Sequence, residues 1–453
     1  MQKTIDKQGV IYTFYSYKGG VGRSMALANV AALLAKWGKR VLIVDWDLEA
    51  PGIENYFDEY QPDLSEQRKK TPGVVDIIHS FDQGTETDWH ECLLNLFPFG
   101  SKHPVSLLAA GKDLPDYVSR LQGLDWEILF NERQLGTYLE KIREQWIGEY
   151  DFILIDSRTG ITDIGGICTI YLPDILVLFF TANQQSLDGI IDVMKRARNS
   201  RDHLPFERNY LIGVPIPSRD ESMTEYAAAR EWRKIFASKL SELYQDWLHR
   251  DKTPEDALKL LRIPYIPYWS FGERLPVVEE GTDDPKSLGF SYEFVAKLLA
   301  NHLEWDKSLK DHKTIFISHA KEDAETARRL NADLEREGFS TWFDEKDLLP
   351  GQNWKSAIRQ AIRECDYFIT LLSTKAVRKR GFVQAEQKFA HDVMDEIPET
   401  DIFIIPARID DCDIPYHLED RHFVDIFPDY QQGLRQMLRA LSPELLHQTG
   451  VPR

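Results

Sequence analysis

Cysteine is scarce in this chain, and long apolar stretches are missing. Four cysteines in 453 residues, with no C-x-x-C pair among them, give neither a disulfide framework nor a zinc-binding spacing. We expect most of them to be buried apolar thiols. No apolar run reaches the roughly 18 residues needed to cross a bilayer, and no signal peptide opens the chain. The sequence therefore predicts a cytoplasmic protein without a membrane partner.

Basic residues are also in deficit. The chain has 55 lysines and arginines against 73 aspartates and glutamates, a formal net charge of −18. Both halves share this acidity, and neither forms a basic arm. Because an acidic surface repels phosphate backbones, the balance argues against nucleic acid as a partner. What is present is a globular chain, 43% hydrophobic and long enough for two or three domains.

The strongest local pattern is a glycine-rich loop between an apolar run at residues 9–14 and an apolar helical run at residues 25–37. Glycines let the loop curl so that successive N–H groups point inward, and the helix adds its positive N-terminus. Such a nest favours phosphate, so we expect Arg23 on a phosphate and the Ser24 hydroxyl on a Mg²⁺ ion.

Two further apolar runs end in carboxylates. Residues 40–45 are typical of a buried parallel strand and lead into Asp45 and Asp47, and residues 150–156 end at Asp156. Open α/β sheets bind ligands at the carboxyl ends of their strands, so these aspartates can fix the Mg²⁺ shell and orient an attacking water. The alternative for Asp45 and Asp47 is that they only solvate a loop.

Together these motifs resemble the ParA/MinD-type ATPases, whose phosphate loop has the deviant Walker A form K-G-G-x-G-[KR]-[ST]. Tyr17 and Arg23 depart from the general pattern, in which a glycine and a lysine stand at these positions. The resemblance implies a doubly wound, mostly parallel P-loop sheet, self-association, and binding of ATP with Mg²⁺. The ATP-binding residues that it implies are Lys18, Gly19, Gly20, Val21, Gly22, Arg23 and Ser24. In that family the early lysine, here Lys18, reaches across a dimer interface to the partner's nucleotide.

A short polar stretch divides the chain. We expect residues 1–303 to form the ATPase domain, residues 304–312 a charged linker and residues 313–453 a second domain. In the second domain the alternation of strands and helices restarts, with about five strands, which predicts a flavodoxin-like sheet. The predicted fold class is therefore α/β in both parts.

The second domain resembles a TIR domain over nearly all of residues 313–441. F-I-S-H-A-K-E-D matches the first box, L-L-P-G-Q-N-W the BB loop, and L-L-S-T-K-A-V-R-K-R-G-F-V-Q-A-E the third strand and the helix after it. Several TIR domains cleave NAD⁺ at the nicotinamide glycosidic bond, and the resemblance places the catalytic glutamate at Glu386. Such a carboxylate can steady an oxocarbenium-like ribose as nicotinamide leaves. The expected NAD-binding residues are Phe316, Ser318, His319, Trp342 and Asp344.

Each of these assignments has a plainer alternative. Phe316 and Trp342 can stack on a substrate, but strand aromatics are as often core residues. His319 can be a structural hydrogen-bonding residue. The basic run at residues 375–380 can attract the NAD pyrophosphate or form a solvated face.

Three functions are compatible with this sequence. The leading hypothesis is an effector of the bacterial antiphage type, in which ATP binding and self-association by the first domain control NAD⁺ cleavage by the second. The second is a non-enzymatic TIR scaffold switched by ATP-dependent oligomerisation. The third is a DNA-partitioning ATPase, against which the net charge of −18 counts.

Overall fold

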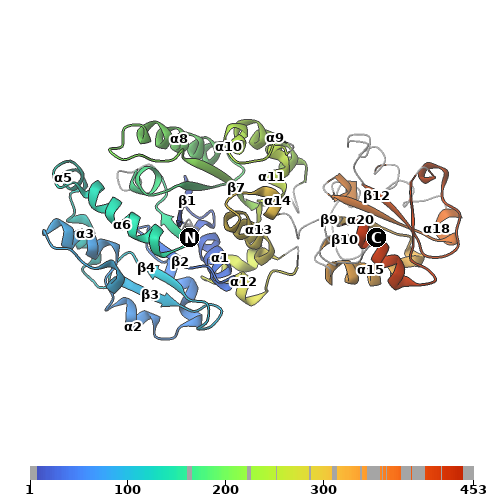
Figure 1. Cartoon of the computed structure of the whole chain (residues 1–453), viewed down its shortest axis with the longest axis horizontal. Coiled ribbons are helices and arrows are strands. Elements are labelled where there is room, and N and C mark those ends of the chain that lie inside the picture. The colour runs from blue at the N-terminus through green and yellow to red at the C-terminus, as the bar shows by residue number, and fades with distance from the viewer. Residues whose placement is uncertain are drawn as a thin grey trace, which may run out of the picture. The chain divides into compact units, whose positions relative to one another are not determined.

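The computed structural model describes the chain in two compact units, Met1–Ser308 and Leu309–Arg453 (Figure 1). The described residues are 8–160, 166–221, 226–250, 252–284, 287–308, 314–336, 339–343, 358–359, 361–363, 365–378, 389, 403–419 and 421–441. Within these ranges no helix is long and apolar enough to cross a membrane.

The first unit is built on a sheet of eight described strands. They are β1 (Val10–Ser16), β2 (Val41–Trp46), β3 (Leu93–Leu96), β4 (Val105–Leu108), β5 (Phe152–Ser157), β6 (Ile175–Phe180), β7 (Ile212–Asp220) and β8 (Ile263–Pro264). Their order is β3-β4-β2-β5-β1-β6-β7-β8, and only β3 and β4 pair antiparallel. Strands β2, β5 and β6 are buried along their whole length, as strands covered on both faces must be.

Helices cover both faces of this sheet. Those described are α1 (Arg23–Lys36), α2 (Leu64–Arg68), α3 (Val74–Asp82), α4 (Tyr117–Gln122), α5 (Trp126–Asn131), α6 (Leu135–Glu149), α8 (Gln184–Arg201), α9 (Tyr226–Lys239), α10 (Ser241–Gln245), α11 (Pro254–Leu260), α12 (Pro276–Glu279), α13 (Leu288–Ala300) and α14 (Trp305–Ser308). Parallel crossovers are right-handed, so α1, leading from β1 to β2, and α8, leading the other way from β6 to β7, lie on opposite faces. Helix α1 packs against α12 and α13.

The second unit holds a five-stranded, all-parallel sheet within its described residues. Its elements are β9 (Thr314–Ser318), β10 (Ser340–Phe343), β11 (Tyr367–Leu372), β12 (Ile404–Arg408), β13 (Val424–Asp425), α15 (Ala324–Arg336), α18 (Thr374–Arg378) and α20 (Tyr430–Leu441). The strand order is β10-β9-β11-β12-β13. Alternation along β9 sends Ile315 and Ile317 into the core with α15 and α20, and Phe316 into a second core on the other face.

The α/β fold class predicted from the sequence is confirmed in both units, including the mostly parallel first sheet. The residues expected to form a linker behave differently in part. Trp305 and Ser308 are buried in the first unit, and the Trp305 ring lies against Phe294 with centroids 5.6 Å apart. The sequence around Trp305 is polar, so it does not reveal that this ring is buried. The contact of this single aromatic ring is enough to hold α14 against α13.

Strand β7 continues through two prolines. Pro215 and Pro217 both pair with β6, although proline is usually confined to edge strands and strand ends. Because they occupy alternate positions, their missing N–H groups fall on the same side of the strand, and only one ladder loses donors. The extension carries Ser218 and Arg219 to the carboxyl end of the sheet.

Candidate functional site

The glycine loop lies between β1 and α1 at the carboxyl end of the sheet. Gly20 and Gly22 have φ values of +72° and +85°, a region that side-chain-bearing residues rarely adopt. A Cβ at Gly20 would meet nothing within 4 Å, so the backbone angle and not crowding requires this glycine. Helix α1 begins at Arg23, and its free N–H groups border the loop. The backbone is thus shaped as an anion cradle.

The end of β7 braces this loop. The Ser218 hydroxyl donates to the carbonyl of Val21, and the Arg219 guanidinium donates to the carbonyl of Gly20 at 2.9 Å. Arg219 also lies over the Tyr265 ring, 4.5 Å from its centroid. No local pattern marked Ser218 or Arg219, because each acts on a loop nearly 200 residues away in sequence.

Tyr17, the residue that replaces the first glycine of the general motif, packs on α8. A Cβ built on Gly189 would lie 2.2 Å from Tyr17 Cγ and 2.5 Å from both Cδ atoms. Gly189 therefore leaves room for the ring in the middle of a helix, where glycine is otherwise unfavourable. No local pattern indicates this contact, which joins the start of the loop to α8.

Gly189→Ala is expected to lower the free energy of unfolding by about 1–3 kcal/mol, because an added methyl group overpacks the Tyr17 ring. The displaced ring lies beside the loop, so we also expect a fluorescent ATP analogue to bind more weakly. Thermal unfolding and equilibrium titration measure the two effects.

Gly148→Ala on α6 is the matched control, since a Cβ there meets nothing within 4 Å. It should leave analogue binding unchanged and stabilise the helix by at most about 1 kcal/mol. Equal melting temperatures for Gly189→Ala and the parent chain would contradict the packing role of Gly189.

The Arg23 side chain is the centre of an acidic cluster. Its Nε donates to Asp156 Oδ1 at 2.6 Å, and its Nη2 donates to Asp47 Oδ2 at 2.9 Å. The Ser24 hydroxyl donates to the other Asp156 oxygen at 2.6 Å. The first turn of α1, the residue after β2 and the end of β5 thus converge, as parallel strand ends should. Four of the predicted side chains lie together here.

Burial and charge oppose each other in this cluster. Burial raises the pKa of Asp47, and the neighbouring Arg23 counteracts the rise. Burial alone would lower the pKa of Arg23, but the charge of Asp156 and its hydrogen bond, with those of Asp47, raise it instead. Arg23 therefore stays charged. Its charge offsets the energetic cost of burying the carboxylates of Asp47 and Asp156.

Asp45 does not join the cluster. Its two carboxylate oxygens accept from the backbone N–H groups of Asp47, at 3.0 Å, and Gly52, at 3.2 Å. The side chain is fully buried, and burial, with Glu54 and Asp156, raises its pKa well above the usual range. Asp45 thus shapes the loop after β2. The sequence predicted it in the Mg²⁺ shell, but both of its carboxylate oxygens are bonded to backbone N–H groups. Asp45 lies in β2 and Asp47 comes directly after it. One strand pattern therefore carries both aspartates and does not distinguish their roles.

Lys18 is half-buried on the same loop. Its carbonyl accepts a hydrogen bond from the Ser16 hydroxyl at 2.9 Å, which fixes the backbone at this residue. Within the described part of the chain we find no hydrogen-bond or ion-pair partner for its ammonium group. Unlike Arg23, this cation is not engaged with the cluster.

The donor set fits a magnesium ion held together with a nucleotide. Mg²⁺ in such sites takes one or two protein ligands, phosphate oxygens and waters. Ser24 is placed to be a direct ligand, and Asp156, already bonded to that hydroxyl, to orient the shell. The described residues contain no group of three His, Cys, Asp or Glu side chains that could hold a metal unaided. Phosphate oxygens would have to complete the coordination.

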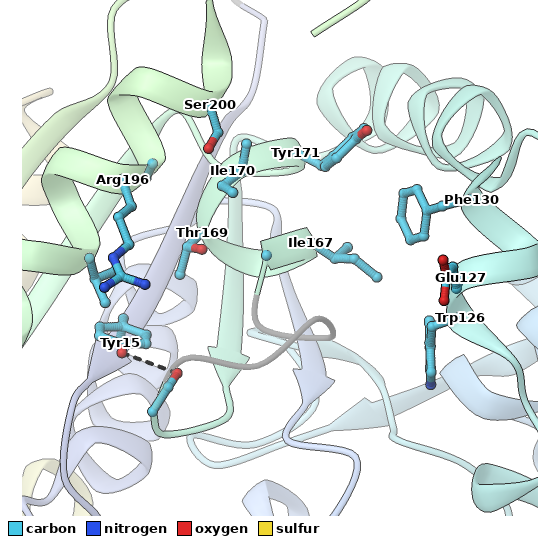
Figure 2. A pocket seen from close by; sticks show the side chains of 14 residues that line it. Tyr15, Trp126, Glu127, Phe130, Ile167, Thr169, Ile170, Tyr171, Arg196 and Ser200 are labelled. Atoms are coloured by element: carbon cyan, nitrogen blue, oxygen red, sulfur yellow. Dashed lines mark hydrogen bonds between the residues drawn. The ribbon is translucent and has the colours of Figure 1, made fainter. Parts of the chain in front are cut away.

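A cavity of about 590 Å³ lies against α8 (Figure 2). Trp126 and Phe130 of α5 line one wall, and Arg196 of α8 points in from the other. At its base the Tyr15 hydroxyl donates to the carbonyl of Gly160 at 3.2 Å. Gly160 follows the acidic end of β5 by three residues, so the cavity adjoins the segment that leads away from Asp156.

A π-helical turn, Ile167–Tyr171, forms the floor of this cavity. Such turns leave carbonyl groups without helical partners. Arg201 donates to the carbonyl of Ile170 at 3.1 Å, and Arg143 to that of Leu172 at 3.0 Å. Burial lowers the pKa of Arg201 to about 10, although Asp174 opposes the shift. Side chains from α6 and α8 thus hold the turn in place.

In the second unit, the predicted aromatic pair is mostly core. Phe316 is 1% exposed and stacks between Trp342, at 4.7 Å, and Phe368, at 5.3 Å between ring centroids. The three residues are register partners on β10, β9 and β11, which explains the row. Phe316 is therefore not available for stacking on NAD⁺. Trp342 is half-buried on β10, which is an edge strand among the described strands of this sheet.

Of the other residues predicted for the NAD site, the structure describes only some. Ser318 is buried at the end of β9 beside Thr370 of β11, and His319 follows it half-buried. Asp344 and Glu386 lie outside the described residues. The structure thus puts Ser318 and His319 at the carboxyl end of β9 and Trp342 level with Phe316 on β10. The catalytic role of Glu386 stays a prediction.

Asp323, the last residue of the F-I-S-H-A-K-E-D motif, is a buried carboxylate outside the predicted NAD-binding set. It accepts a hydrogen bond from the Ser373 hydroxyl at 2.8 Å, and burial raises its pKa despite that bond. Asp410 accepts from the backbone N–H and the hydroxyl of Thr374 at 2.8 and 3.0 Å. Both bonds fix the segment between β11 and α18, so we assign these carboxylates to holding the strand end in shape.

Two family models match the chain: an AAA domain over residues 9–207 and a TIR domain over residues 315–438. An uncharacterized ATP-binding protein of Methanocaldococcus jannaschii is 28% identical over 197 residues, 43% of this chain and 62% of that protein. NAD(+) hydrolase TcpC of Escherichia coli O6:H1 is 39% identical over 70 residues, 15% of this chain and 23% of that protein. Among solved structures, the chain is similar to the septum site-determining protein MinD complexed with Mg-ADP from Pyrococcus horikoshii OT3. The TM-score is 0.43 at 18% sequence identity, and the match covers 66% of this chain and 98% of the MinD chain.

The chain spans 62% or less of the length of these two relatives. The two matched segments fall one in each compact unit, and each coincides with one of the two sets of motifs read from the sequence. The expected fusion is therefore confirmed: the chain joins a P-loop ATPase domain, matched by the AAA model at residues 9–207, to a TIR domain at residues 315–438.

Proposed function

We propose that the chain is a nucleotide-controlled NAD⁺ hydrolase. In this proposal ATP and Mg²⁺ bind the P-loop domain, the chains self-associate, and the TIR domains brought together cleave NAD⁺ to release nicotinamide. The observation that supports it most is the pairing, in one polypeptide, of the Arg23–Asp156 phosphate-loop cluster with a TIR domain. The similarity of a 70-residue segment to a protein named NAD(+) hydrolase supports NAD⁺ as the proposed substrate.

The chemistry divides between the two domains. In the first, the loop N–H groups and Arg23 hold phosphates, Ser24 ligates the metal, and Asp47 and Asp156 position the metal shell and water. In the second, the proposed catalytic carboxylate is that of Glu386, and the proposed NAD-binding residues are Ser318, His319, Trp342 and Asp344. The class of bacterial antiphage effector that the chain resembles would use this reaction to exhaust NAD⁺.

The purified chain should consume NAD⁺ and release nicotinamide when ATP and Mg²⁺ are present, and at least about tenfold more slowly without ATP if assembly controls the site. Chromatographic measurement of nicotinamide and the oligomer mass by light scattering are recorded on the same samples. A rise in mass with nucleotide but no loss of NAD⁺ would favour a non-enzymatic scaffold. Tight binding to duplex DNA at physiological salt would favour a partitioning ATPase instead.

A further inference from the structure

The guanidinium of Arg23 uses only part of its donor capacity in the acidic cluster. The side chain is 6% exposed, and its Nε and Nη2 are committed to Asp156 and Asp47. The third nitrogen, Nη1, is buried and has no hydrogen-bond partner among the described residues. Buried donors without a partner are rare and costly, so Nη1 is a vacant donor at the phosphate loop.

Arginine can make this arrangement, and lysine cannot. A guanidinium presents three nitrogens in a rigid plane, so it can bond two separate carboxylates and still offer N–H groups elsewhere. An ammonium is a single nitrogen on a flexible stem and acts as a point charge. With lysine at residue 23, the charges of Asp47 and Asp156 could not both be matched in this way, and a divalent cation would be needed to balance them.

We propose that Arg23 is a resident cation of the nucleotide site and reduces the dependence of nucleotide binding on Mg²⁺. Arg23 keeps its bonds to Asp47 and Asp156 and donates from Nη1 to a phosphate oxygen of the nucleotide. One of the two carboxylate charges is thereby neutralised before any metal arrives. The inference rests on the proposed ATP site and concerns how that site is charged, not whether it exists.

The test is equilibrium binding of a fluorescent ATP analogue to the full chain, with excess Mg²⁺ and with EDTA. For the parent chain we expect the dissociation constant to rise by less than about threefold when Mg²⁺ is removed, and for Arg23→Lys by more than about tenfold. A parent chain that loses affinity as steeply as Arg23→Lys would overturn the inference. Absence of binding in both buffers would overturn the proposed ATP site itself, so the two failures are distinguishable.

Arg40→Lys is the matched control. Arg40 makes an ion pair with Asp151 at 2.7 Å, but it is exposed and lies at the opposite end of β2. It should leave both dissociation constants unchanged. If Arg23→Lys does not show a cooperative melt, Asp47→Asn replaces it: this variant keeps Arg23 and removes one negative charge, so its loss of affinity in EDTA should also stay below about threefold. A loss above about tenfold in Asp47→Asn would contradict the resident-cation role.

Discussion

Glu386→Ala is expected to reduce nicotinamide release by at least about 10²–10³-fold, while ATP binding and assembly stay as in the parent chain. Its carboxylate is proposed to face the ribose, where positive charge develops as the glycosidic bond breaks, and removing such a preorganised charge costs about this much in rate. Steady-state assays of nicotinamide release at saturating ATP measure the effect.

Two controls make this result specific. Glu386→Gln keeps the shape but removes the charge, so it should be nearly as inactive as the alanine variant. Glu419→Ala removes an exposed carboxylate of the same domain, after the turn Tyr416–Leu418, and should retain full activity. Cleavage that survives Glu386→Ala unchanged would refute the site assignment and leave the ATP-dependent proposals standing.

The sequence predicted those parts of the site that depend on residues close together in the chain. The Lys18–Ser24 loop and the strands ending near Asp47 and Asp156 each follow from local patterns: glycine for positive φ, apolar runs for buried strands. Parallel topology then brings the strand ends to one edge without further information. For this reason the sequence could predict that Ser24 lies close to Asp156. It could not predict that the Arg23 guanidinium bonds both Asp47 and Asp156.

What the sequence could not supply depends on partners far apart in the chain. Ser218 and Arg219 brace the loop only because β7 runs past Pro217, against the usual effect of proline. Phe316 is core because its register neighbours on β10 and β11 are both aromatic. Trp305 is buried because α13 offers it Phe294. In each case a tertiary contact overrides a local preference, and a single sequence does not show such contacts.

Lys18→Ala is expected to abolish ATP-dependent self-association while the monomer still binds nucleotide. Arg23 and Ser24 hold the proposed phosphate and metal contacts within one chain, whereas the Lys18 ammonium has no partner in the described residues and is free to serve a second copy. Loss of a charge-assisted contact to a phosphate at an interface typically costs about 2–5 kcal/mol, enough to remove a micromolar dimer. Light scattering with and without ATP measures assembly, and analogue titration measures binding.

The control for this variant is Lys39→Ala, an exposed lysine beyond the end of α1, which should assemble normally. If Lys18 acts on the partner's nucleotide, mixtures of the variant and the parent chain should show a predictable loss of activity. If each Lys18 completes the partner's site, a Lys18→Ala chain mixed with the parent chain should form dimers with one complete site of two, and ATP-stimulated NAD⁺ cleavage should fall in proportion to the fraction of variant. If Lys18→Ala instead weakens analogue binding as strongly as it weakens assembly, the lysine acts on its own chain's nucleotide, and assembly is driven by contacts outside the loop.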